Sequence, residues 1–194
     1  MLTVAPTVLG ARVGASRKAM TLLLIGSGAI VTALAAQWKI WLPNNPVPIS
    51  GQTFAVLLVG AGLGMRAGAA SQALYLLMGA VGLPVFTDGQ SGMDVLFGST
   101  SGYLFGFVVA AAVVGRMAES TADRRVRTAV PAFAVGSLII YAFGVIGLMI
   151  TLGWGLGEAI TKGVVPFVVG DALKAVAAGL LLPAAWKLAR NVRS

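Results

Sequence analysis

The chain has 194 residues, of which 58% are hydrophobic and 10% are charged, and its mean hydropathy is +0.92. Soluble domains carry about 25% charged residues and still expose roughly a third of their surface at this size, so this composition excludes an ordinary soluble globule and predicts a membrane protein. The absence of cysteine and histidine excludes disulfides, thiolate catalysis, Cys/His metal or haem sites and Ser-His-Asp triads.

Six apolar segments are predicted to cross the bilayer, which takes roughly 20 mostly apolar residues per helix. They cover about residues 19–38, 49–64, 67–83, 102–118, 129–153 and 164–188. The second and third segments are short and are separated by Met65 and Arg66, which favours a helical hairpin with a tight turn. One long kinked helix is the alternative, but it would place Arg66 in hydrocarbon at a cost of several kcal/mol. The predicted fold class is an all-α integral membrane protein, a six-transmembrane-helix bundle forming a single domain over residues 1–194.

The first segment also has features of a cleaved signal peptide. Basic residues at positions 12, 17 and 18 precede the apolar stretch, and Ala33-Leu34-Ala35 resembles a signal-peptidase site. We favour an uncleaved span, because the stretch is long enough to cross the bilayer and completes one bundle with the other five.

The basic residues follow the positive-inside rule when the N-terminus lies in the cytoplasm. Of the 14 basic residues, 11 then fall in cytoplasmic segments, and the outer loops hold only Lys39 and Lys162. Both termini are therefore predicted to be cytoplasmic. The net charge of +8 is explained by topology, and no nucleic-acid partner is expected.

Two outer connections differ in composition from the inner ones. Trp41–Gln52 is rich in Pro and Asn, and Pro84–Ser101 is rich in Gly, Ser, Thr and Asp. Long connections in a compact bundle often act as lids or binding elements, although solvated surface turns are the alternative. Prolines at positions 43, 46 and 48 exclude a regular helix in the first of them.

An acid and an amine occur within the last predicted span. Asp171 and Lys174 are three residues apart, so they lie on the same side of a helix. Counted from Val164 on the outer side, they lie about 10 Å and 15 Å into the membrane. Charges at that depth normally face a protein interior or a wet cavity. A ligand or ion site open to the outside is the functional interpretation, and a self-neutralising pair that fixes helix packing is the structural one.

Small residues four apart indicate close helix packing, within this bundle or against a partner. Such pairs occur at Ala29 and Ala33 and at Gly60 and Gly64. The sequence has no G-x-x-x-x-G-K-[ST] motif, so the chain is not a P-loop ATPase. No enzyme, cofactor or metal site is predicted, and a channel lacks its carboxylate rings and filter repeat. A small-substrate uptake protein remains.

Four runs of sequence carry a family resemblance. They are Val47–Thr53, Gly79–Phe86, Gly98–Phe107 and Pro166–Ala175. Together they resemble the BioY family, the biotin-binding S component of energy-coupling factor (ECF) transporters, over about residues 20–185. Family members usually read Gly-Pro-Thr-Gly-Gly-Tyr where this chain has Gly98–Tyr103. Many also carry a basic residue in the loop after Val85-Phe86, where this chain has Asp88, Gln90 and Ser91.

The resemblance implies a multi-pass protein of a prokaryotic cell membrane that captures biotin from the outside. It implies as partners a transmembrane coupling subunit and two cytosolic ATPases, whose ATP hydrolysis drives delivery inward. Solitary or homo-oligomeric function is left open. The alternative from another class is a stand-alone ion- or proton-coupled carrier for a small carboxylate, and a purely structural membrane scaffold is a further one.

The resemblance also implies a set of site residues. The family's Asp and Lys of the last helix correspond to Asp171 and Lys174, and the coupling-subunit patch corresponds to Ala29 and Ala33. A buried carboxylate suits the two ureido N–H groups of biotin, while Lys174 either donates to the ureido oxygen or keeps Asp171 ionised. The other predicted substrate-binding residues are Gln52, Thr53, Tyr75, Phe86, Asp88, Ser91 and Tyr103.

Overall fold

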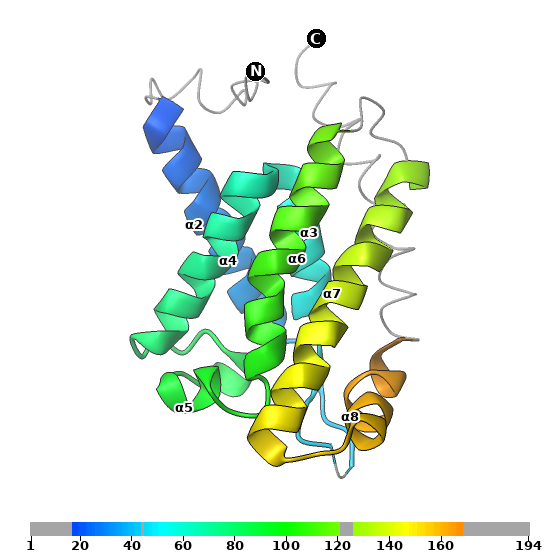
Figure 1. Ribbon diagram of the computed structural model, residues 1–194. Coiled ribbons are helices and arrows are strands. Elements are labelled where there is room, and N and C mark those ends of the chain that lie inside the picture. The colour runs from blue at the N-terminus through cyan, green and yellow to red at the C-terminus, as the bar shows by residue number, and fades with distance from the viewer. Residues whose placement is uncertain (1–16, 44, 121–125, 169–194) are drawn as a thin grey trace.

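The computed structural model describes residues 17–43, 45–120 and 126–168, which form a bundle of helices (Figure 1). In chain order its elements are α2 (Arg17–Ala36), β1 (Lys39–Ile40), β2 (Ile49–Ser50), α3 (Gln52–Leu63), α4 (Met65–Ala80), the 3-10 helix η1 (Thr87–Gly89), α5 (Met93–Leu96), α6 (Ser101–Ser120), α7 (Val126–Leu152) and α8 (Leu156–Gly163). Three of these helices contain segments long and apolar enough to cross a membrane, namely Lys18–Ala36, Ser101–Ser120 and Val130–Leu152, and α3 is a shorter apolar helix. The chain is therefore a mostly helical membrane protein.

Five of the six predicted spans coincide with helices to within a few residues. The predicted hairpin is also present, because α3 ends at Leu63 and α4 begins at Met65, with Gly64 between them at a φ of 83°. A non-glycine residue would be strained at that φ. Of the sixth predicted span, only its first five residues are described, and residues 165–168 of these are helical.

The helix of the second predicted span begins at Gln52, later than the expected start at about residue 49. Ile49 and Ser50 form β2, which pairs antiparallel with β1, so that Ile49 lies opposite Ile40. Pro46 and Pro48 favour extended backbone before this point, because proline disfavours the helical conformation of the residue that precedes it. The helix therefore begins at Gln52.

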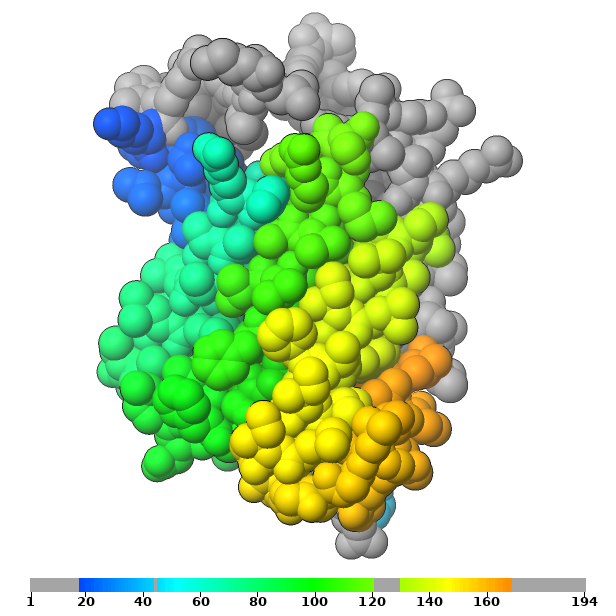
Figure 2. All heavy atoms as spheres, viewed as in Figure 1, coloured from blue at the N-terminus to red at the C-terminus, as the bar shows by residue number. Residues whose placement is uncertain are grey.

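Glycines set the spacing between α6 and α7, which pack along their length (Figure 2). A Cβ atom added to Gly147 would lie 2.7 Å from the Cα atom of Gly102, and one added to Gly106 would lie 3.2 Å from the Cα atom of Ile140. Backbones that approach so closely gain van der Waals contact, which is the main source of helix association in lipid.

The Gly60 and Gly64 pattern serves packing within the bundle. A Cβ atom on Gly60 would lie 2.7 Å from the carbonyl oxygen of Ala111 in α6. At the next turn, the Met65 backbone N–H donates to Glu119 Oε1 at 2.9 Å. The Glu119 carboxylate of α6 thus accepts from the first backbone amide of α4, which has no partner within its own helix.

Helix α2 has a buried face toward α4 and an exposed face. Ala29 is completely buried within the chain, whereas Ala33 is half-buried. Beside them, Gln72 Nε2 of α4 donates to Thr32 Oγ1 at 3.1 Å. The exposed face carries large apolar side chains at Leu22, Leu23, Ile30, Val31 and Leu34. The small-residue pattern of α2 thus packs at least partly inside the bundle, and its role at a partner interface stays a prediction.

The connecting segments with irregular structure gather at one end of the bundle (Figure 1). The pair β1–β2, the helix η1 with α5, and α8 all lie there, opposite the end where α3 turns into α4. Asn45 links two of these segments, because its Nδ2 donates to the Lys162 carbonyl at 2.7 Å.

Candidate functional site

A cavity of about 330 Å³ opens at this end of the bundle. Its walls come from the β1–β2 segment, the start of α3, the η1–α5 loop, the start of α6, the middle of α7 and Phe167. Its polar lining consists of Ser50, Gln52, Thr53, Thr87, Gln90, Asp94, Ser99 and Thr100. Its aromatic lining consists of Trp41, Phe86, Tyr103, Phe107, Tyr141 and Phe167.

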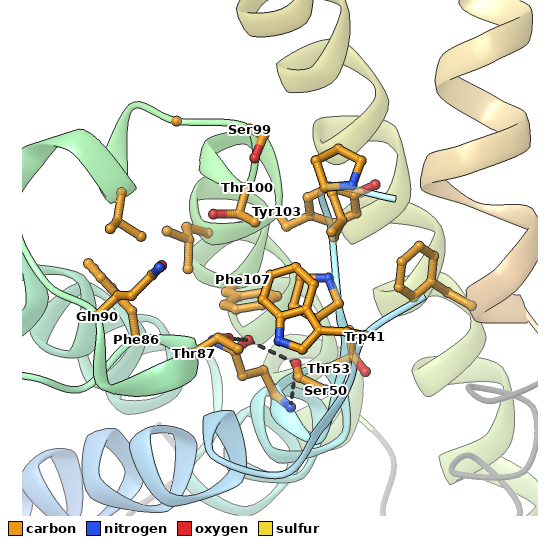
Figure 3. A pocket seen from close by; sticks show the side chains of 18 of the residues that line it. Trp41, Ser50, Thr53, Phe86, Thr87, Gln90, Ser99, Thr100, Tyr103 and Phe107 are labelled. Carbon is orange, nitrogen blue, oxygen red and sulfur yellow. Dashed lines mark hydrogen bonds between the residues drawn. The ribbon is translucent and has the colours of Figure 1, made fainter. Parts of the chain in front are cut away.

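The structure brings four of the predicted site residues together in this cavity. Gln52, Thr53, Phe86 and Tyr103 all line it (Figure 3). Three others are close by but are not among the lining residues, namely Tyr75, Asp88 and Ser91. Asp171 and Lys174 lie outside the described residues, so their part in the site stays a prediction.

Gln52 organises the polar wall of the cavity at the first turn of α3. Its Oε1 accepts hydrogen bonds from Ser50 Oγ at 2.8 Å and from Thr87 Oγ1 at 3.1 Å, and its Nε2 donates to Tyr75 Oη at 2.7 Å. The side chain is buried. Because every one of these bonds crosses to another segment or turn, the amide orientation is determined by the fold before any ligand arrives.

Tyr75 and Phe86 form an aromatic layer behind this wall. Their rings meet edge to face with centroids 5.5 Å apart, and both are almost completely buried. Tyr75 Oη also donates to the Val85 carbonyl at 3.2 Å. Gly79 lies against the Phe86 ring, so a side chain at this position would displace the ring. Tyr75 therefore positions Phe86 and Gln52 from behind the cavity.

Tyr103 closes the cavity on the side of α6 and α8. Its hydroxyl donates to the Gly163 carbonyl at 2.7 Å, and its ring centroid lies 6.4 Å from that of Phe167. Gly144 of α7 lies directly against the Tyr103 ring. The ring can occupy this place because α7 has no side chain there.

Asp88 contacts residues at the start of the first outer connection and does not itself line the cavity. It forms an ion pair with Lys39, and it accepts a hydrogen bond from Trp41 Nε1 at 3.0 Å. The same turn is bonded to Gln37, whose Nε2 donates to the Phe86 carbonyl at 3.1 Å and whose Oε1 accepts from the Gly89 N–H at 3.2 Å. These contacts hold Trp41 where its indole lines the cavity (Figure 3).

Several lining residues were not predicted from the sequence. Trp41, Gln90, Asp94, Phe107 and Tyr141 are among them. Phe107, and also Ser50 and Thr100, belong to the quoted motifs Val47–Thr53 and Gly98–Phe107, so membership of a motif was the signal that could have found them. Tyr141 had no such signal, because it lies within the apolar span of α7, outside all four quoted motifs.

The lining suits a small ligand that combines an apolar body with a few polar groups. Buried rings can cover apolar surface, and hydroxyl and amide groups can exchange hydrogen bonds with uncharged polar atoms. The polar groups are already bonded to one another across segments, which lowers the entropic cost of ordering them around a ligand.

Comparison with known proteins gives consistent results. A model of the BioY family matches residues 4–191. "Biotin transporter BioY" of Thermotoga maritima is 39% identical over 81% of this chain and 92% of its own length. "Biotin transporter BioY" of Rhizobium etli is 35% identical over 79% of this chain and 85% of its own length.

A solved structure shares the fold. It is the S-component for biotin from an ECF-type ABC transporter, with a TM-score of 0.79 and 22% sequence identity. The match covers 88% of this chain and 93% of that one.

Proposed function

The chain belongs to the BioY family, and from this membership we propose that it is a biotin-uptake protein, the substrate-binding S component of an ECF-type transporter. The observation that carries this proposal is the cavity of about 330 Å³ with aromatic walls and a preorganised amide at Gln52. Biotin has an apolar thioether ring, a ureido group with two N–H donors and one carbonyl, and a valerate tail. A lining of rings, hydroxyls and amides offers partners for each of the uncharged parts.

ATP hydrolysis belongs to other subunits. The sequence has no P-loop motif, and an ABC-type S component binds substrate while separate proteins hydrolyse ATP. The chain is therefore a transport subunit and has no enzymatic activity of its own. A transmembrane coupling subunit and two cytosolic ATPases complete the proposed transporter.

We propose that the cavity faces the outside of a prokaryotic plasma membrane, with six spans and both termini in the cytoplasm. Two observations support this orientation. The connections at the cavity end carry only Lys39 and Lys162 as basic residues, and the opposite end carries exposed Arg66 and Arg116. This asymmetry follows the positive-inside rule.

Asp171 and Lys174 complete the proposed site from the last span. Phe167 lines the cavity and is buried, and Asp171 is four residues further along the chain. If the helix at residues 165–168 continues, Asp171 lies one turn beyond Phe167 on the same face. There it would accept the ureido N–H groups of biotin.

The coupling subunit is proposed to bind helix α2. The face with Leu23, Ile30 and Leu34 is exposed and apolar, and Ala33 beside it is half-buried. This face can pack against another helix without rearrangement of the chain, whereas Ala29 is already covered.

Binding of radiolabelled biotin to the purified protein in lipid nanodiscs tests the function. We expect saturable binding that unlabelled biotin displaces, and we expect Asp171→Asn to weaken it at least tenfold, because a charge-assisted hydrogen bond becomes a neutral one. Gly26→Ala is the matched control, since nothing lies within 4 Å of a Cβ atom there. Absence of saturable binding to the wild-type protein would refute the proposal.

Uptake into cells separates the proposal from a stand-alone carrier. Uptake through an ECF-type transporter stops when ATP is depleted and continues when the membrane potential is collapsed. The opposite pattern would identify an ion- or proton-coupled carrier.

A further inference from the structure

Asp94 differs from the other described carboxylates at the cavity end in having no partner. Asp88 is paired with Lys39, and Glu158 is paired with Lys162. The Asp94 side chain makes no hydrogen bond or ion pair with another described residue, and it is exposed. Its negative charge is therefore available to whatever approaches it.

Asp94 also lines the cavity. It lies in the first turn of α5, in the wall that includes Val95 and Ser99. Among the lining residues that the structure describes, it is the one that carries a charge at neutral pH. The described lysines at this end of the bundle, Lys39 and Lys162, are paired with other carboxylates and do not line the cavity.

The cavity lining combines buried aromatic side chains with exposed polar ones, which suits a ligand with an apolar body and a polar tail. Phe107, Tyr141 and Phe167 are at most 8% exposed. Gln90 and Asp94 are exposed. Burial of the apolar ring system against the buried aromatic side chains is favoured by the hydrophobic effect. The tail then extends toward Gln90 and Asp94, where water reaches it.

We propose that Asp94 is a specificity-determining residue that disfavours an anionic tail and favours biotin derivatives whose carboxyl group is masked as an amide, most of all those that end in an ammonium group. This inference rests on the proposed function and specifies its substrate class. The neutral Gln90, which also lines the cavity, can donate to and accept from an amide, and it adds no positive charge for a carboxylate. The cavity therefore takes up N-biotinyl amines as well as free biotin.

The test compares three ligands that share the ring system and differ only in the charge of the tail. They are biotin, which is anionic, biotinamide, which is neutral, and N-biotinyl ethylenediamine, which is cationic. Their dissociation constants are measured by competition against radiolabelled biotin for the wild type, Asp94→Asn and the control Glu158→Gln. The control removes an equal charge at the same end of the bundle but away from the cavity lining.

The expected result is a change that follows the tail charge. Relative to biotinamide, Asp94→Asn tightens biotin about threefold and weakens the cationic ligand about threefold, as for one interaction between partly exposed charges. Glu158→Gln leaves both ratios unchanged. A merely structural role for Asp94 would move all three dissociation constants in the same direction.

Salt provides a second measurement on the unmodified protein. Raising the ionic strength screens exposed charges, so the wild type should bind biotin better relative to the cationic ligand at 0.5 M than at 0.05 M salt. If wild-type protein binds biotin but the ratios change neither with salt nor in Asp94→Asn, the inference about Asp94 is overturned while the proposed function stands. If no ligand of the series binds, the proposed function fails.

Discussion

Substitution of Asp88 should accelerate the release of biotin without destroying the cavity. Asp88 holds Lys39 and Trp41 of the first outer connection, and Trp41 lines the cavity. If these contacts break, the Trp41 indole is no longer held over the ligand. Asp88 itself does not line the cavity, so we expect its effect on biotin to be transmitted through Trp41 and to appear in the dissociation rate constant.

The magnitude follows from the two contacts. The side chains of Lys39 and Asp88 are 25% and 37% exposed, and an ion pair of this exposure contributes about 0.2–1 kcal/mol. The hydrogen bond from Trp41 involves a charged acceptor, and because the indole is half-exposed we assign it about 1 kcal/mol, below the usual range for charged groups. Loss of both contacts therefore costs about 1–2 kcal/mol, which corresponds to a roughly 5- to 30-fold faster release.

Two substitutions separate the contacts. Asp88 has a φ of 66°, a conformation that Asn and Gly tolerate, so neither replacement strains the turn. Asp88→Asn keeps an oxygen that accepts from Trp41 and loses only the ion pair, whereas Asp88→Gly loses both contacts. We expect release to be slowest in the wild type, faster in Asp88→Asn and fastest in Asp88→Gly.

The assay is a chase of bound radiolabelled biotin with excess unlabelled ligand, with association measured separately. Lys39→Gln should match Asp88→Asn, and the double variant should show no further increase, because both changes remove one interaction. Glu158→Gln, which breaks an unrelated ion pair on α8, is the control. Unchanged release in Asp88→Gly, or additive effects of Lys39→Gln and Asp88→Asn, would refute the reasoning.

Three further substitutions test other parts of the structure. Gly147→Leu should lower the melting temperature by several degrees in a thermal unfolding assay. A Cβ atom at this position would lie 2.7 Å from the Cα atom of Gly102, and overpacking of this kind costs about 1–3 kcal/mol. A variant that melts like the wild type would contradict the close contact. Gln52→Leu should weaken biotin binding at least tenfold in the radioligand assay, because Tyr75 and Thr87 each lose a hydrogen-bond partner; retained affinity would show that this amide does not organise the site. Thr32→Val should leave biotin affinity unchanged and lower the melting temperature, since it removes the Gln72 bond between α2 and α4; weaker binding at an unchanged melting temperature would be inconsistent with a packing role.

The helices could be predicted because their signal is local. Runs of apolar residues interrupted by charges locate the helices of the first five predicted spans within a few residues, as at α6, where 102–118 was expected and Ser101–Ser120 is observed. The start of α3 could not be predicted in the same way. Ile49 and Ser50 are paired with residues nine and eleven positions earlier, and such pairing is decided by another segment, whereas hydropathy describes only the segment itself.

Asp88 shows the limit of composition as a guide to the site. Its position after Val85-Phe86 in a polar outer loop made it a candidate ligand contact, and the loop does border the cavity. Its partners, Lys39 and Trp41, lie almost fifty residues earlier in the chain. No local pattern distinguishes a carboxylate that faces a cavity, such as Asp94, from one that is occupied by a lysine of another segment.

Two buried glutamines show why three-dimensional placement, and not residue type, separates a packing role from a binding role. Gln52 and Gln72 are both buried amides in apolar helices, and a polar group in a membrane span is costly unless it is satisfied. Gln72 meets Thr32 across the α2–α4 contact, and neither side chain lines the cavity. Gln52 is also hydrogen-bonded, but it lies in the first turn of α3, where the irregular connections meet and line the cavity. A hydrogen-bonded amide therefore becomes part of a binding site when its partners come from segments that leave a cavity beside it. In this chain those segments are the connections at one end of the bundle.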